Sequence, residues 1–367
     1  MSSDPEVPAG ADPGTVCPME LPPTIGVTGA AGFVGSHLCE RLLGDGRGVV
    51  GVDNLSHGTL RNLDRCLNQP GFRFVEMDCR DRRGLTRAFA GCQAIVHLAG
   101  EKIPRYGGAV HTLEANVDGA SSVYATALLL DAHVVLASTS DVYGNTAPPL
   151  REDAELTLGP PTTRRWAYAT SKLYDEHLAL ALAEERGLRV TILRLFGCYG
   201  PHNHPSWWGG PQAAFIERLL DGEEMEIHGD GRQLRTFTFV DETVTGVVLA
   251  LDTPDAVGEI INVGAGTTTS IVELAEAVQR AVGVPGALRA VFIPYESIGG
   301  RYQDVRRRMP DTDKAHRLLG FRATIGLGQG LPPTVAWHRR RRDEAGGSPG
   351  RPELEFAARS SPEGGPE

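Results

Sequence analysis

Two side chains in this sequence have the types and the spacing of an acid–base pair. Tyr168 and Lys172 are four positions apart in a segment with helical periodicity, so both side chains project from one face of a helix. A tyrosine ordinarily loses its proton at about pH 10, and a neighbouring ammonium group favours the phenolate. Such a pair can take a proton from a substrate hydroxyl at neutral pH. The same spacing also occurs on amphipathic helices whose lysine simply faces solvent.

A polar segment after a predicted strand supports the catalytic interpretation. Residues 137–144 read Ala-Ser-Thr-Ser-Asp-Val-Tyr-Gly and follow the apolar run 134–137. Active-site groups of open α/β sheets collect at the carboxyl ends of strands. Thr139, Ser140 and Asp141 are therefore candidate catalytic residues beside Tyr168 and Lys172. An aspartate at a strand end also commonly caps a turn, which stays open as an alternative for Asp141.

Three glycines near the start of the chain mark a phosphate-binding turn. Residues 28–35, Thr-Gly-Ala-Ala-Gly-Phe-Val-Gly, follow a short apolar run and open an amphipathic stretch. Glycine at these points permits a tight turn, close approach of a pyrophosphate and close packing of helix on strand, and the helix N-terminus offers free N–H groups to the anion. Asp53 ends the next apolar run, where an acid binds the adenosine ribose, and no arginine follows it at once. These features predict NAD rather than NADP.

Short β-rich runs alternate with helical patterns through the first half of the chain. Strands are predicted at residues 24–27, 48–52, 72–75, 94–98, 134–137 and 190–195, and helices at 33–43, 85–89, 113–130 and 168–185. Alternation of this kind implies right-handed βαβ units in a parallel sheet that is covered on both faces. The predicted fold class is α/β, a Rossmann-type doubly wound parallel sheet with a smaller C-terminal substrate-binding lobe.

The composition changes after Gly200, and this sets the expected domain boundaries. Residues 21–200 are predicted to form the NAD-binding domain, and residues 201–338 mainly the lobe, with some return to the sheet. Helices are expected there at 212–220 and 271–281, and a strand at 236–240. Residues 1–20 and 339–367 are rich in polar residues, Pro and Gly, and are predicted to be disordered.

Bulk properties exclude several classes of protein. The 367 residues are 41% hydrophobic and 22% charged, which is ordinary for a globular protein, and the net charge of −10 argues against a nucleic-acid surface. No apolar run approaches the length of a membrane span. The six cysteines lack the paired spacing of metal ligands, so no metal is expected. The placement of several of them in apolar segments suits reduced thiols, so a cytoplasmic location is expected.

The ordered motifs together resemble extended short-chain dehydrogenase/reductases of the nucleotide-sugar epimerase, dehydratase and decarboxylase group. The resemblance runs from about residue 24 to 337. It rests on the glycine turn, Asp53-Asn54, Asp78, His97-Leu-Ala-Gly, Asn116, Thr139 with Tyr168 and Lys172, and Gly229-Asp-Gly-x-x-x-Arg235. It implies oxidation of a hexose at C4, with Thr139 bonded to the hydroxyl that Tyr168 deprotonates.

The same resemblance implies two sets of contacts. Those to NAD are Gly29, Gly32, Phe33, Val34, Gly35, Asp53, Asn54, Asp78, Cys79, Leu98, Ala99, Gly100, Lys102, Asn116, Tyr168 and Lys172. Those to a UDP-sugar are Arg105, Tyr106, Thr139, Arg235 and Arg306, although Arg235 and Arg306 also fit solvated surface arginines. A homodimer is expected, because the helices at 113–130 and 168–185 are rich in Ala and Leu around most of their circumference.

The residues before Val142 bear on the fate of the oxidised sugar. Thr139-Ser140-Asp141 resembles the Thr-Ser-Glu of UDP-glucuronate decarboxylases with one methylene removed. The prediction is therefore decarboxylation of UDP-glucuronate through a UDP-4-keto intermediate to UDP-xylose, with escape of some UDP-4-keto-xylose. The segment 97–102, which ends in Lys102, resembles epimerases instead, so a UDP-sugar 4-epimerase is the alternative. A non-catalytic NAD-binding scaffold is disfavoured, because both Tyr168 and Lys172 are present.

Overall fold

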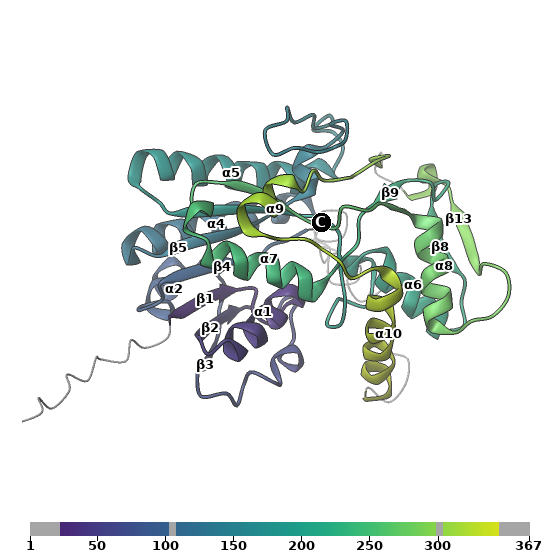
Figure 1. The fold of residues 1–367 in the computed structure, drawn as a ribbon, viewed down its shortest axis with the longest axis horizontal. Helices are drawn as coiled ribbons and strands as arrows, with labels where there is room; N and C mark the ends of the chain where they lie inside the picture. Colours follow the sequence, from purple (N-terminus) through teal and green to yellow (C-terminus); the bar gives the residue numbers. More distant parts are fainter. Residues whose placement is uncertain (1–22, 103–107, 299–303, 345–367) are drawn as a thin grey trace, which may run out of the picture.

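A seven-stranded parallel sheet forms the centre of the molecule (Figure 1). The computed structural model describes residues 23–102, 108–298 and 304–344. The strand order is β11-β6-β5-β4-β1-β2-β3, and every pairing is parallel. The strands are β1 (Thr24–Thr28), β2 (Gly48–Asp53), β3 (Phe72–Glu76), β4 (Ala94–His97), β5 (His133–Thr139), β6 (Val190–Leu195) and β11 (Ile260–Val263). The order reverses between β1 and β4, where ligands of such sheets bind. The predicted Rossmann-type fold is confirmed.

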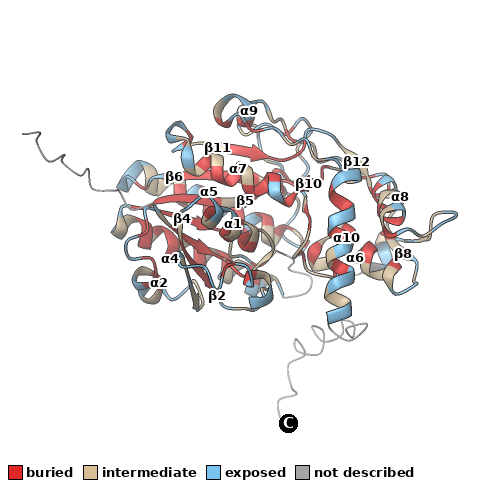
Figure 2. Ribbon diagram, turned by 60° about the horizontal axis from the view of Figure 1, so that its bottom comes forward, coloured by how far each residue is buried: buried red, intermediate tan, exposed pale blue. Residues whose placement is uncertain are grey.

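Helices cover both faces of this sheet. One face packs on α1 (Phe33–Gly44) and α7 (Val240–Asp252), and the other on α2 (Arg82–Ala88), α4 (Ala109–Leu130) and α5 (Trp166–Arg186). Val49 belongs to the first core and its neighbour Val50 to the second, because successive side chains of a strand point to opposite faces. Both faces are buried (Figure 2), so the strands are apolar throughout rather than alternating.

A smaller lobe lies beside the carboxyl ends of the strands (Figure 1). It contains α6 (Pro211–Leu220), α8 (Ile271–Val282) and α10 (Leu327–Glu344), with a parallel pair formed by β8 (Met225–His228) and β13 (Ala290–Ile293). The short pairs β7 (Cys198–Tyr199) with β10 (Thr238–Phe239) and β9 (Leu234–Arg235) with β12 (Thr269–Ser270) lie in the connecting segments, and α9 (Asp313–Leu319) packs near β11.

The structure corrects several of the predicted elements. The expected strand at 236–240 is correct only at Thr238–Phe239, because residues 236–237 are irregular and Val240 begins α7. The strand β11 and the helix α7 were not predicted, and both pack on the first domain. Residues 339–344, expected in a disordered tail, form the last part of α10. Residues 1–20 and 345–367 lie outside the described part of the chain.

A buried ion pair ties helix α5 to the sheet. Nη2 of Arg194 on β6 lies 2.7 Å from Oε2 of Glu176, and both side chains are less than 5% exposed. The hydroxyl of Ser138 donates a further hydrogen bond to Glu176, and the guanidinium of Arg194 lies 4.8 Å from the ring of Tyr143. The helix that carries Tyr168 and Lys172 is thereby fixed to β5 and β6.

We expect Glu176→Ala to lower the free energy of unfolding by about 3–5 kcal/mol, because it leaves a buried guanidinium without its partner. Urea denaturation followed by circular dichroism measures this change. Asp45→Ala breaks the exposed pair with Arg41 and serves as the control, with an expected loss of at most about 1 kcal/mol. Equal losses for the two variants would contradict the structural role given to Glu176.

Candidate active site

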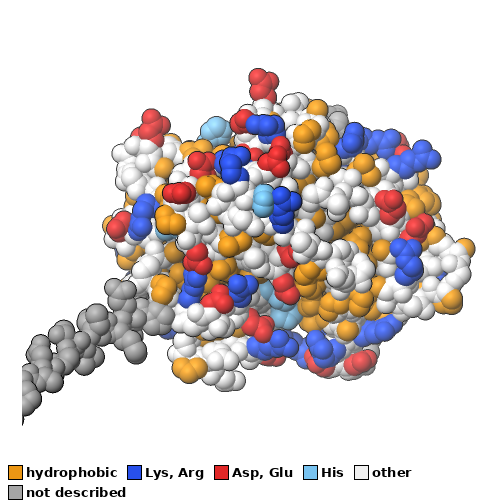
Figure 3. All heavy atoms as spheres, viewed as in Figure 1, with side chains coloured by type: hydrophobic (Ala, Val, Ile, Leu, Met, Phe, Trp, Pro, Cys, Tyr) orange, Lys and Arg blue, Asp and Glu red, His pale blue; other side chains and the backbone are white. Residues whose placement is uncertain are grey.

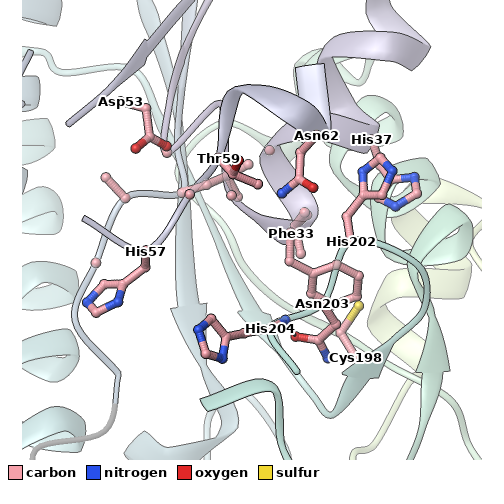
Figure 4. A pocket seen from close by; sticks show the side chains of 18 of the residues that line it. Phe33, His37, Asp53, His57, Thr59, Asn62, Cys198, His202, Asn203 and His204 are labelled. Carbon is pink, nitrogen blue, oxygen red and sulfur yellow. Dashed lines mark hydrogen bonds between the residues drawn. The ribbon is translucent and has the colours of Figure 1, made fainter. Parts of the chain in front are cut away.

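A cavity of about 1390 Å³ opens at the carboxyl edge of the sheet. Figure 4 looks into it, with Asp53 at the end of β2, His57 on the segment that follows and His204 on the loop after β7. Of the residues predicted to contact NAD, those that line the cavity are Gly29, Gly32, Phe33, Val34, Gly35, Asp53, Asn54, Asp78, Cys79, Leu98, Ala99, Gly100, Lys102, Tyr168 and Lys172. The structure thus gathers nearly all of the predicted cofactor site around one space.

The turn between β1 and α1 leaves room for a phosphate because Gly29 and Gly32 carry no side chains. Gly29 has φ +71°, and a Cβ there would lie 2.8 Å from the backbone nitrogen of Ala99. A Cβ on Gly35 would collide with the carbonyl group of Gly29. No side chain caps the N-terminus of α1, so its first N–H groups face the cavity. A dinucleotide pyrophosphate fits this cradle.

Asp53 is held in place by backbone N–H groups. Its Oδ2 accepts a hydrogen bond from the nitrogen of Ala31 at 3.0 Å, and its Oδ1 accepts one from the nitrogen of Leu55 at 2.8 Å. Burial raises the pKa of this carboxyl, and the two backbone bonds oppose the rise. The carboxylate keeps lone pairs free to accept hydrogen bonds from ribose hydroxyls.

We expect Gly35→Ala to lower NAD occupancy in the purified protein and to destabilise the fold by about 1–3 kcal/mol, because the added methyl forces the turn apart. The absorbance of released NAD and thermal melting measure the two effects. Gly44→Ala at the other end of α1 meets nothing within 4 Å and is the matched control, with occupancy unchanged. Loss of NAD in both variants would point away from the turn.

The predicted catalytic residues come together on two elements. Thr139 ends β5, Ser140 and Asp141 open the following 3₁₀ turn, and Tyr168 and Lys172 lie on α5. The side chains of Thr139 and Tyr168 are hydrogen-bonded to each other. Burial, and then the carboxylate of Asp141, raise the pKa of Tyr168, and the bond with Thr139 opposes them. The protein by itself therefore favours the protonated phenol.

Asp141 is paired with two arginines. Its Oδ1 lies 2.6 Å from Nη2 of Arg308 and 3.4 Å from Nη2 of Arg165. Burial alone would raise the pKa of Asp141, but these two guanidinium groups outweigh it and hold the pKa below its ordinary value. The turn-capping alternative does not describe this side chain, because its carboxylate bonds to side chains from two distant segments.

The pairing continues to the predicted phosphate-binding arginine. Oδ1 of Asp304 lies 2.7 Å from Arg235 and 3.0 Å from Arg165. Arg165, Arg235, Arg308, Asp141 and Asp304 thus form one cluster, named here the arginine–aspartate cluster. It joins β9, the start of α5 and the segment before α9, so it spans the two parts of the molecule.

The prediction for the run of three arginines needs correction. Arg306 points outward and pairs with Asp230, with 69% of its side chain exposed. Arg308 is the member that pairs with Asp141, and 11% of its side chain is exposed. The sequence offered no means to choose among three consecutive arginines, and Arg165 was missed because it stands alone before a helix. Arg105 and Tyr106 lie outside the described residues.

Asn116 also has a different place from the one predicted. It does not line the cavity; its side chain bonds to the backbone of Glu101 and to the hydroxyl of Ser171. It therefore supports the wall of the site by connecting the segment after β4 to α5. Lys102 does line the cavity, and burial lowers its pKa to about 8.

The loop 201–210 forms another wall of the cavity. The ring of Trp208 stacks on that of His57, with 4.0 Å between centroids, and His202 bonds to Ser36 on α1. The loop therefore both lines the cavity and packs against α1. Within the described residues no cluster of His, Cys, Asp and Glu is suited to a metal ion.

A protein-family model matches more than half of the chain. It is described as "NAD dependent epimerase/dehydratase family" and covers residues 25–264. The chain belongs to this family. NAD is therefore its cofactor, as the glycine turn and Asp53 predicted, and the residues around the cradle fit it.

Curated relatives within the family carry out different reactions. A UDP-N-acetyl-alpha-D-glucosaminuronate decarboxylase of Bacillus cytotoxicus is 32% identical over 85% of this chain and 97% of its own. UDP-glucuronic acid decarboxylase 1 of Xenopus tropicalis is 31% identical over 86% of this chain and 72% of its own. A UDP-glucose 4-epimerase of Mycolicibacterium smegmatis is 34% identical over 86% of this chain and 98% of its own. Overall identity therefore does not select one reaction.

A solved structure supports the cofactor and the fold. The UDP-glucuronic acid 4-epimerase of Bacillus cereus, in complex with UDP-glucuronic acid and NAD, superimposes with a TM-score of 0.78 at 27% identity, covering 87% of this chain and 99% of that one. In the part of this chain that the structure describes, no helix is both long enough and apolar enough to cross a bilayer. On the face drawn in Figure 3, basic and acidic side chains are interspersed.

Proposed function

We propose that the protein decarboxylates UDP-glucuronate through a UDP-4-keto intermediate to UDP-xylose. The observation that carries this proposal is the pairing of Asp141 with Arg308 and Arg165 next to Tyr168. A hexuronate differs from a neutral hexose by a carboxylate, and a guanidinium fork is the side chain best suited to bind one. Decarboxylases among the relatives support the same choice.

The residues of the chain divide the work in a simple way. Tyr168 takes the proton of the C4 hydroxyl, with Thr139 aligning that hydroxyl and Lys172 favouring the phenolate. Hydride exchange with C4 of the sugar is the chemistry that NAD supplies when bound. The resulting 4-ketone makes the sugar a β-keto acid, so the C5–C6 bond breaks, CO2 leaves, and the bonding electrons enter an enolate. Protonation at C5 and return of hydride to C4 complete the pentose.

The arginine–aspartate cluster supplies a carboxylate site for this substrate. Nη2 of Arg308 donates to Asp141, while its Nε is buried without a hydrogen-bond partner among the described residues, so an incoming uronate carboxylate can bind this guanidinium. Asp141 stays ionised near neutral pH because its pKa is lowered. Its two open roles are to orient the water that protonates C5 or to destabilise the substrate carboxylate by like charge. For Arg235, at the far end of the cluster, we propose binding of the diphosphate, which a guanidinium group suits.

Aspartate in place of glutamate shortens the reach of this carboxylate. We therefore propose that the keto intermediate is enclosed less securely and that part of it leaves as UDP-4-keto-xylose. A homodimer is also proposed, because Leu129 on α4 and Tyr174 on α5 are exposed large side chains on the two helices that pack together. Such a pair of helices can meet its copy across a two-fold axis.

A UDP-sugar 4-epimerase remains the second candidate, and Lys102 is the observation that favours it. This lysine lines the cavity, as the resemblance of its segment to epimerases implies. An epimerase would return hydride to the other face of the ketone and keep C6. The two candidates therefore differ in whether CO2 is released.

We expect purified protein incubated with UDP-glucuronate to release CO2 and to form UDP-xylose with a minor share of UDP-4-keto-xylose. Mass spectrometry and NMR of the sugar nucleotides distinguish the products. UDP-N-acetylglucosaminuronate and UDP-glucose belong in the same panel, because relatives act on related sugars. Formation of UDP-galacturonate or UDP-galactose without CO2 would establish the epimerase instead.

We expect Arg308→Gln to reduce kcat/KM for CO2 release by about ten- to hundred-fold, since a charge-assisted hydrogen bond contributes about 1.5–3 kcal/mol. Initial rates of CO2 release measure the effect. Arg307→Gln is the matched control, because Arg307 is the exposed neighbour in the same run and should leave the rate near that of the unmodified protein. If the two variants behave alike, the carboxylate site lies elsewhere.

A further inference from the structure

We propose that Asp175 is a positioning residue for Lys172: it fixes the ammonium group by an ion pair and offsets its charge, which disfavours the phenolate form of Tyr168. This inference rests on the proposed function, in which Tyr168 and Lys172 act together. It adds a residue that neither the sequence motifs nor the resemblance brought forward.

The ion pair is short and fully enclosed. Nζ of Lys172 lies 3.0 Å from Oδ2 of Asp175, three residues further along α5, and the two side chains are 4% and 0% exposed. Among the described residues no other group forms a hydrogen bond with either carboxylate oxygen. The hydroxyl of Tyr124 on α4 donates to the carbonyl oxygen of Asp175 at 3.0 Å, which holds this turn of the helix in place.

Asp175 takes no part in joining α5 to the sheet. The next residue, Glu176, already joins α5 to the sheet through Arg194 and Ser138. Asp175 makes none of those contacts, and its carboxylate pairs with Lys172, which lines the cavity. A buried carboxylate costs free energy unless it is paired. Because Lys172 is the partner of Asp175, we infer that the role of Asp175 is to hold this lysine.

The other charged and titratable groups around the pair leave Asp175 as the direct counter-charge. Lys172 also faces His97 on β4, but burial lowers the pKa of His97 to about 3, so this ring is neutral. Asp175 faces Tyr124 and Glu176, and Glu176 is neutralised by Arg194.

Tyr168 faces Thr139 and Asp141, with Arg308 behind Asp141. Burial is the main cause of its raised pKa, and the carboxylates of Asp141 and Asp175 add to it. Removing the charge of Asp175 should therefore lower the pKa of Tyr168, and the base should become active at lower pH.

The test is the isosteric variant Asp175→Asn in the full-length, NAD-loaded protein. We expect the acid limb of the pH profile of kcat/KM to move down by about half to one pH unit. A second readout does not use turnover: the phenolate absorbance that is lost in Tyr168→Phe should appear at lower pH in Asp175→Asn. Glu184→Gln removes one charge from the same helix, three turns beyond the ion pair, and should leave both curves unchanged.

Several results would decide against the inference. An unshifted acid limb in folded Asp175→Asn, or an equal shift in Glu184→Gln, overturns it. Asp175→Ala is the second variant in case the amide disturbs folding, and it must shift the curves in the same direction. If Tyr168→Phe is inactive while Asp175→Asn behaves as the unmodified protein, this inference alone fails. If Tyr168→Phe retains full turnover, the proposed function fails and this inference with it.

Discussion

Charged side chains buried at the carboxyl edge of the sheet are stable here only as pairs. Lys172 with Asp175, Arg194 with Glu176 and Arg308 with Asp141 each join two charges that water reaches poorly. The three pairs surround the helix that carries Tyr168. Because each removes an uncompensated charge, the phenol can sit in a dry site without the fold losing its stability.

The pairs also explain how a rigid sheet and a smaller lobe can share one site. The sheet supplies the glycine turn, Thr139 and Asp141, all at strand ends, and the segments beyond Gly200 supply Arg235 and Arg308. Asp304 and Asp141 bridge these segments through Arg165, at the start of α5. Because Arg165 pairs with both aspartates, a change at one member of this cluster alters the partners of the others.

Local sequence was sufficient for the dinucleotide half of the molecule. The glycine turn, the apolar strands and the acid that ends β2 each depend on neighbours within a few residues. Six strands and the main helices lie within a few residues of their predicted places. Elements in the second half were harder to predict from the sequence. The strand β11 and the helix α7 are defined by packing against strands and helices that lie far away along the chain. The expected strand at 236–240 shortened to β10 for the same reason, since its pairing with β7 covers only two residues.

The sequence by itself determined the cofactor cradle, the family resemblance and the candidate acid–base pair, because backbone freedom at glycine and helical spacing are local properties. Only the tertiary structure decided that Arg308 rather than Arg306 pairs with Asp141, that Asn116 supports a wall, and that Asp175 pairs with Lys172. These outcomes depend on which buried charges meet across distant segments. Desolvation makes an unpaired charge costly, and no local pattern records which partner relieves it.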